Sequence, residues 1–139
     1  MRCTARKKPR APVTAGNLYA SDRIEMFLTP FERGLVAHLV ADWLLQNDWM
    51  ALNKMNLRHP AGWVHASIHG LLLGLALGWA GGVVLGILHL LLDTGHPLNW
   101  WIRVFKKCDR APQAVLIRLW TDQVMHITAI AAWITFVPR

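Results

Sequence analysis

The stretch from Leu71 to Leu92 contains a single ionisable residue, His89, in an otherwise apolar run. A helix needs about 20 predominantly apolar residues to cross the hydrocarbon core of a bilayer, and this run is long enough. Basic residues and the eight Trp residues lie mostly near the ends of the apolar blocks, where head groups and an aromatic belt would place them. The sequence therefore predicts a small multi-pass integral membrane protein.

No short apolar core with a small-residue cleavage site occurs near the N-terminus, so no removable signal peptide is expected.

The formal net charge of +7 raises the alternative of a nucleic-acid partner. Because the basic residues lie between apolar blocks and in the N-terminal tail, lipid head groups are the favoured partner, and no nucleic acid is expected. Cys3 and Cys108 form no metal-type pair and are expected to be unpaired thiols.

The predicted fold is an all-α, membrane-embedded four-helix bundle formed by a single domain over residues 23–139. A basic tail over 1–22, rich in Pro and small residues, is expected to be disordered. Thr29 and Glu32 form a capping box at the start of the first helix, and residues 98–107 suit a short interfacial helix. The expected spans are about 30–52, 61–78, 82–95 and 113–136.

Residues 61–95 could form one span or a hairpin that turns at GWAGG, residues 78–82. A single helix would separate His65 from Asp93 by roughly 42 Å, more than the ~30 Å hydrocarbon core. The hairpin keeps these two polar residues on one side of the membrane and is favoured for that reason. Ala66, Gly70 and Gly74 also give the first arm a small-residue face for close helix packing.

Each expected span carries two polar side chains four residues apart, which lie on one face of a helix. When the helices are aligned as antiparallel neighbours, the turn centres fall near residues 53, 79 and 107, in or beside the expected turns. The alignment predicts a deep layer of four imidazoles and a second layer nearer the loops. The first comprises His38, His69, His89 and His126, and the second Asp42, His65, Asp93 and Asp122.

Carboxylates in a membrane are costly unless they are paired or hydrated, so a set in register indicates a shared role. Imidazole and carboxylate without thiolate suit a divalent metal, with Zn favoured and Mn, Fe or Ni as alternatives. Eight candidate ligands exceed the needs of one tetrahedral ion, so either two ions share the site or some residues orient the ligands. A purely structural polar network, a proton relay and haem binding by the four-histidine layer remain open alternatives.

The charge of six basic residues in the loops on the ligand side would attract an anion such as a phosphate ester or a phospholipid head group. These residues are Lys54, Arg58, Arg103, Lys106, Lys107 and Arg110. The same basic residues place this side weakly toward the cytoplasm. The expected substrate-binding residues are Gln46, Lys54, Arg103, Lys106 and Gln123.

The segments HLVADWLLQNDWMALNK (38–54), VHASIH (64–69), HLLLD (89–93) and DQVMH (122–126) resemble an uncharacterised family of small bacterial and phage multi-pass membrane proteins. The resemblance covers roughly residues 31–136 and implies a location in the bacterial inner membrane. The pattern is also similar in style to inner-membrane proteins described as metal-dependent hydrolases. The HPLNWW stretch after Asp93 departs from the expected continuation toward a Lys.

Two functions follow as expectations. The first is a membrane-embedded metal-dependent hydrolase that acts on a phosphorylated or lipid substrate, with a metal-activated water as nucleophile and a carboxylate of the second layer as general base. The second is a non-enzymatic, metal-stabilised membrane scaffold or phage–host accessory protein. A homo-oligomer is compatible with either function.

Overall fold

The computed structural model describes residues 28–108 and 112–137, and within these ranges it is helical, without strands. The all-helical fold expected from the sequence is confirmed. The expected tail over 1–22 lies outside the described residues, as do Cys3 and Arg110, whereas Cys108 is a half-buried free thiol. The elements are α2 (Pro30–Leu39), the π-helix η1 (Val40–Leu45), α3 (Asp48–Asn53), α4 (Pro60–Leu77), α5 (Trp79–Asp93), α6 (His96–Trp101), the π-helix η2 (Ile102–Lys106) and α7 (Ala114–Phe136).

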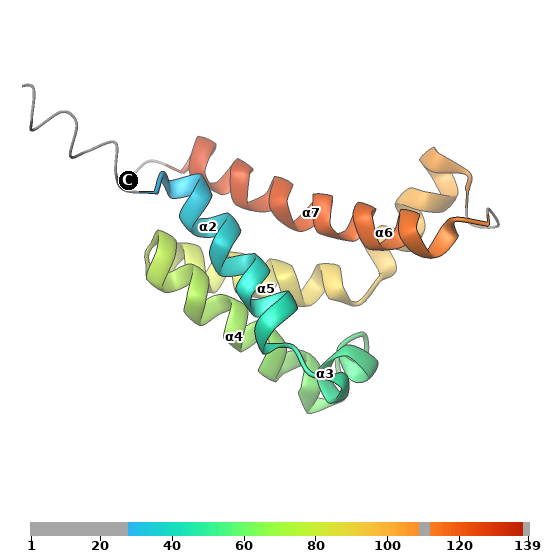
Figure 1. Ribbon diagram of the computed structural model, residues 1–139, viewed down its shortest axis with the longest axis horizontal. Coiled ribbons are helices and arrows are strands. Elements are labelled where there is room, and N and C mark those ends of the chain that lie inside the picture. Colours follow the sequence, from blue (N-terminus) through green and yellow to red (C-terminus); the bar gives the residue numbers. More distant parts are fainter. Residues whose placement is uncertain (1–27, 109–111, 138–139) are drawn as a thin grey trace, which may run out of the picture.

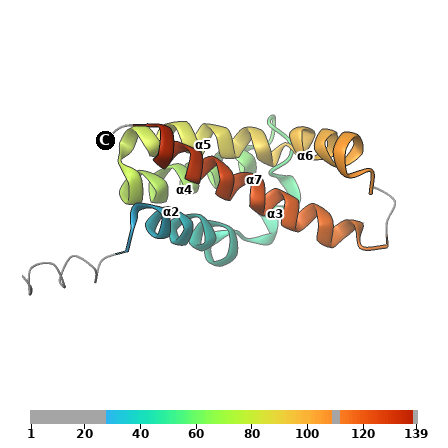
Figure 2. The same ribbon diagram turned by 90° about the horizontal axis from the view of Figure 1, so that it is seen from above.

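Four helices, α2, α4, α5 and α7, form a closed bundle. The most extensive contact joins α4 to α5; α2 packs on α4 and α7, and α5 also packs on α7. Figures 1 and 2 show that α3 and α6 lie at the side of the molecule opposite the C-terminal end of α7. The bundle therefore has one end built from loops and short helices, and the polar pairs of the four helices lie toward that end.

The first helix begins where the sequence predicts but does not continue as one α-helix. The hydroxyl of Thr29 accepts a hydrogen bond from the backbone N–H of Glu32, whose carboxylate accepts one from the N–H of Thr29. The helix widens into η1, breaks at Gln46, and restarts as α3. Asn47 causes the restart, because its side chain accepts from the N–H of Met50 as an N-cap. The expected continuous helix over 30–52 is thus divided in two.

The α4–α5 pair is a tight hairpin that turns at Gly78, within the GWAGG stretch expected to form the turn. Gly78 has φ +94° and ψ 154°, a conformation that side chains disfavour. The two helices lie so close that a Cβ on Gly82 would collide with the carbonyl oxygen of Gly70 and would lie 2.6 Å from the Cα of Gly74. Small residues therefore allow the backbones of α4 and α5 to meet directly.

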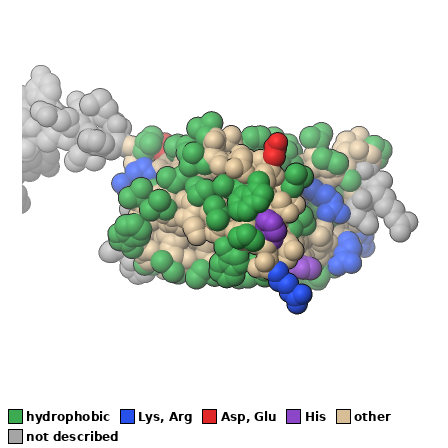
Figure 3. Space-filling model, turned by 90° about the horizontal axis from the view of Figure 1, so that it is seen from below, with side chains coloured by type: hydrophobic (Ala, Val, Ile, Leu, Met, Phe, Trp, Pro, Cys, Tyr) green, Lys and Arg blue, Asp and Glu red, His purple; other side chains and the backbone are tan. Residues whose placement is uncertain are grey.

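The outer surface of the bundle is strongly apolar. Leu75, Trp79, Val83, Ile87 and Leu91 are all exposed on the α4–α5 pair. Figure 3 shows one face on which hydrophobic side chains cover much of the surface, with most of the Lys and Arg side chains toward one end.

By length and composition, one described helix, α4, could cross a membrane. The pair formed by α5 and α6–η2 could make a second, broken span, bent by 57°. The core helix of a soluble protein can have the same length and composition, so these two features are weak support for the expected multi-pass architecture.

Candidate metal centre

Polar side chains from all four bundle helices meet in the interior. Because each helix carries its pair at i and i+4, both side chains of a pair leave one face and point inward. The buried members, all 5% exposed or less, are His38 of α2, His65 and His69 of α4, His89 and Asp93 of α5, and His126 of α7. Asp42 of η1 joins them with a side chain that is 6% exposed. These seven residues form what we term the His/Asp cluster.

Four imidazoles of the cluster form a closed ring. The ring centroids are 5.1 Å apart for His38 and His69, 3.5 Å for His69 and His89, 4.3 Å for His89 and His126, and 5.3 Å for His126 and His38. These are the four residues that were expected in one layer when the predicted helices were aligned as antiparallel neighbours. His65, expected in the other layer, lies 4.7 Å from His69 and 5.0 Å from His89, so it adds a fifth imidazole to the group.

Asp42 lies against three of the imidazoles. Its Oδ1 is 3.2 Å from Nε2 of His65 and 3.1 Å from Nε2 of His69, and its Oδ2 is 3.5 Å from Nε2 of His38. Gln123 of α7 donates a hydrogen bond of 2.9 Å from Nε2 to the same Oδ2. The amide of Gln123 thus orients a carboxylate of the cluster instead of facing solvent.

Asp42 lies in the π-helical turn η1, which directly follows the α-helix that carries His38. Single π-helical turns occur frequently at functional sites, where they re-aim side chains. The turn ends at Gln46, whose half-buried side chain has a buried carbonyl oxygen without a hydrogen-bond partner. Irregular backbone is therefore concentrated beside the cluster.

Asp93 of α5 lies against three imidazoles, which come from α4, α5 and α7. Its Oδ2 is 3.2 Å from Nε2 of His89 and 3.4 Å from Nε2 of His65, and its Oδ1 is 3.8 Å from Nε2 of His126. Lys54, from the loop after α3, places its Nζ 3.2 Å from Oδ2 of Asp93. The Lys54 side chain is 18% exposed, so it joins the buried carboxylate to the loop end of the bundle.

The donor atoms converge as metal ligands do. Two overlapping groups each offer ligand atoms within 4.8 Å of one another: Asp42 with His65, His69 and His89, and Asp93 with His89 and His126. Imidazole nitrogen and carboxylate oxygen are suitable ligands for Zn and other divalent transition metals. The described residues can therefore hold a divalent ion.

Hydrogen bonding within the cluster is incomplete in a way that fits a cation. The Nε2 atoms of His38, His65, His89 and His126 are buried without a hydrogen-bond partner among the described residues. They nevertheless lie 3.2–3.8 Å from carboxylate oxygens. Buried polar atoms are normally satisfied, and orphaned ones in a group indicate a missing partner such as an ion or water.

His126 gives the clearest case. Its Nδ1 donates a hydrogen bond of 2.9 Å to the backbone carbonyl of Asp122, so in the neutral ring Nε2 bears a lone pair. That lone pair faces Oδ1 of Asp93, which is also an acceptor. Two acceptors approach each other favourably only when a proton or a cation lies between them, so this nitrogen is available as a ligand for a cation.

The remaining predicted residues lie at the margin of the cluster or outside it. Asp122 belongs to neither ligand group; its Oδ2 is 3.8 Å from Nδ1 of His126, and its side chain is 19% exposed. Arg103 and Lys106 are exposed on η2 and make no contact with the cluster. Of the five expected substrate-binding residues, Lys54 and Gln123 contact carboxylates of the cluster. The sequence allowed Gln46 and Gln123 to position either a substrate or a ligand, whereas it did not indicate the contact of Lys54 with Asp93.

No curated protein and no solved structure matches this sequence at a significant level. A family described as "Protein of unknown function (DUF3307)" matches residues 31–138, which include the whole cluster and all of the bundle except Pro30. The expected membership of an uncharacterised family is thereby confirmed: the chain belongs to the DUF3307 family.

Proposed function

We propose that this protein is a membrane-embedded metal-dependent hydrolase whose His/Asp cluster binds one or two divalent ions, with Zn favoured over Mn, Fe or Ni. The observation that carries the proposal is the set of four buried, unpartnered Nε2 atoms directed at two carboxylates. With neutral imidazoles, the one ammonium that the described residues place against the carboxylates of Asp42 and Asp93 is that of Lys54, which lies beside Asp93. A divalent ion offsets the remaining negative charge and uses the unpartnered nitrogens as ligands.

The number of donors allows either one ion, with the remaining residues orienting its ligands, or two ions. A tetrahedral catalytic ion uses three protein ligands and one open position, whereas the cluster offers seven side chains. The two ligand groups share His89, and both carboxylates have two oxygens within reach of imidazole nitrogens. In two-metal sites, ions about 3.5–4 Å apart stabilise the attacking and leaving oxygens together.

The membrane setting is supported by the apolar exterior, by α4 as a candidate span, and by the broken α5–α6 pair. An interior that collects seven polar side chains while the exterior displays leucine, valine and tryptophan matches the inside–outside pattern of polar sites in membrane helices.

Hydrolysis is the reaction that fits the surroundings of the cluster. The metal supplies a Lewis acid and a water nucleophile at neutral pH. Water oxygen bonds to the phosphorus of the ester, the bond from phosphorus to the ester oxygen breaks, and the leaving oxygen takes up a proton. Asp122 is suited to accept the proton released by water, because it lies beside His126 without belonging to a ligand group.

The test measures phosphate release from p-nitrophenyl phosphate and from phosphatidic acid by the purified protein. We expect EDTA to abolish release and Zn or Mn to restore it. Asp122→Asn should keep its metal and lose roughly 10²–10⁴-fold in turnover, the contribution of a general base. Asp48→Asn, an exposed carboxylate on α3, is the matched control and should behave as wild type. Turnover that survives chelation, or full activity in Asp122→Asn, would refute the hydrolase proposal.

A metal-stabilised scaffold is the second candidate, favoured by the complete burial of His65 and His69. In a scaffold, substitutions of cluster residues lower metal content and folded protein together. A folded, metal-replete Asp122→Asn protein that has lost only turnover excludes it.

A further inference from the structure

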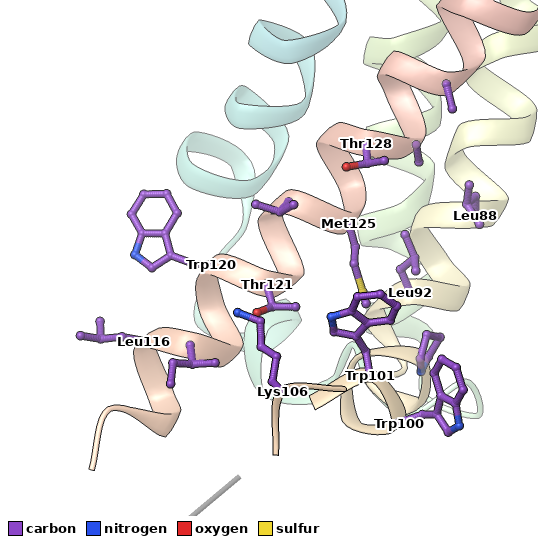
Figure 4. Close-up of a pocket in the computed structure, with 15 residues that line it drawn as sticks. Leu88, Leu92, Trp100, Trp101, Lys106, Leu116, Trp120, Thr121, Met125 and Thr128 are labelled. Atoms are coloured by element: carbon purple, nitrogen blue, oxygen red, sulfur yellow. The ribbon is translucent and has the colours of Figure 1, made fainter. Parts of the chain in front are cut away.

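A large apolar groove lies beside the metal centre, between α5, the α6–η2 segment and α7. Its volume is about 780 Å³, within the ~300–1,000 Å³ range of ligand pockets. The walls include Leu88 and Leu92 of α5, Trp100 and Trp101 of α6, and Met125 of α7. Figure 4 shows these side chains gathered around the cavity.

Among the described residues that line the groove, one is charged, Lys106 of η2. Figure 4 shows Lys106 near the part of the groove that Thr121 and Trp101 line, with Thr128 and Leu88 farther along. The groove is thus cationic toward the loop end of the bundle and apolar along the rest of its length. Along α7 its lining extends from Leu116 to Ala132, roughly 24 Å at helical rise.

This distribution of charge and apolar surface is complementary to an anionic amphiphile. An elongated apolar wall accommodates a hydrocarbon chain, and an ammonium group at one end attracts a phosphate. Three tryptophans of the lining, Trp100, Trp101 and Trp120, belong to the same end as Lys106, where indole rings favour the head-group region.

Only a thin wall separates the groove from the His/Asp cluster. Leu88, Leu92 and Ala129 line the groove on one side and, on the other, a small cavity bounded by His38, His89 and His126. On α7, Thr121 and Met125 line the groove. The adjacent residues Asp122 and His126 belong to the margin and the interior of the metal centre.

We propose that this groove binds an acyl chain of an anionic phospholipid and holds its phosphate near Lys106, and that this lipid class is the substrate. The second clause rests on the proposed hydrolase function; the binding itself does not. Lys106 provides the preference for an anionic head group, and the apolar length of the groove provides the preference for a long chain.

The test is native mass spectrometry of protein released from vesicles of equimolar phosphatidylglycerol and phosphatidylcholine, with and without EDTA. In EDTA, where no turnover is expected, wild-type protein should retain one phosphatidylglycerol in preference to phosphatidylcholine. Without EDTA the retained phosphatidylglycerol should decrease, because it is hydrolysed. Lys106→Ala should lose roughly fivefold of this preference. Arg33→Ala, an exposed cation of α2 outside the groove lining, should keep it.

Groove-filling variants test the apolar part. Thr128→Trp, at an exposed position within the groove, and Ala132→Trp should both lose the retained lipid. The control Val115→Trp, exposed on α7 outside the groove lining, should retain it. Equal retention of the two lipids by wild type in EDTA, or full retention by folded Thr128→Trp, would overturn the groove proposal. A wild-type protein that retains no lipid but hydrolyses p-nitrophenyl phosphate refutes the lipid assignment alone. Retained lipid without any metal-dependent hydrolysis refutes the hydrolase and leaves the binding site.

Discussion

Lys54 brings an ammonium group to the edge of a buried cluster whose other charged members are carboxylates. Its Nζ lies 3.2 Å from Oδ2 of Asp93, the same oxygen that approaches His65 and His89. A cation bound among these imidazoles would compete with Lys54 for that oxygen. Lys54 therefore stabilises the carboxylate most strongly when no metal ion is bound.

Substitution of Lys54 should consequently have an effect that depends on metal. Lys54→Met leaves Asp93 without its ammonium partner, which should lower the free energy of unfolding by about 1–3 kcal/mol in EDTA. With saturating Zn the loss should be much smaller, because the ion replaces the positive charge. Denaturant unfolding under both conditions measures this difference, with Arg58→Met, an exposed cation of the same loop, as the control. An equal loss with and without Zn would contradict a metal beside Asp93.

At the scale of single residues, the sequence anticipated which imidazoles meet in the interior where helical spacing decides geometry. The pairs at i and i+4 are directed inward, and the ring of His38, His69, His89 and His126 was anticipated from spacing and turn positions. The contact of Lys54 with Asp93 was not anticipated, because it depends on a loop path. Loop paths follow from caps and tertiary packing, which periodicity does not encode.

Among the elements, the α4–α5 hairpin sets how closely two pairs of cluster residues approach. A Cβ on Gly82 would lie 2.6 Å from the Cα and 2.7 Å from the backbone N of Gly74. Both neighbouring atoms belong to the backbone, so relief requires the helices to separate. Such separation would also move His65 and His69 away from His89 and Asp93.

Gly82→Ala should therefore weaken the fold and the metal site together. We expect a loss of about 1–3 kcal/mol in unfolding free energy, as for other overpacked positions. Metal affinity should fall as well. Val83→Ala, at the adjacent and exposed position, should change stability by less than about 0.5 kcal/mol. Thermal unfolding and metal titration in detergent measure both quantities, and a Gly82→Ala protein as stable as wild type would show that the close approach is unimportant.

The first helix shows why element boundaries were harder to predict than their existence. Its apolar pattern runs past Gln46, but the local hydrogen bond from Met50 to the side chain of Asn47 starts a new helix. A π-helical turn precedes the break and leaves no signature in residue periodicity. The hairpin turn was easier to anticipate, since glycine supplies the positive φ at residue 78.

For the whole molecule, the bundle has a loop end near the cluster and an opposite end where α2 begins and α7 finishes (Figure 1). A protein that spans the bilayer should expose these ends to different compartments. In a background with Cys3 and Cys108 replaced by serine, Asn56→Cys and Thr135→Cys mark the two ends at exposed positions. We expect a membrane-impermeant thiol reagent applied to intact cells to label Thr135→Cys alone, because the basic loops favour the cytoplasm. Labelling of both or of Asn56→Cys alone would contradict the predicted orientation, and recovery in the soluble fraction would contradict membrane insertion.

The central claim is that the His/Asp cluster binds divalent metal, and elemental analysis of purified protein tests it most directly. The wild type should contain about one or two equivalents of a transition metal, Zn foremost. Asp93→Asn preserves shape but removes the negative charge, so its metal affinity should fall by at least roughly 10–100-fold, the loss seen even for outer partners of ligands. Asp48→Asn should retain full metal content. Wild-type protein without stoichiometric metal, or an Asp93→Asn protein with unchanged metal content, would contradict the account.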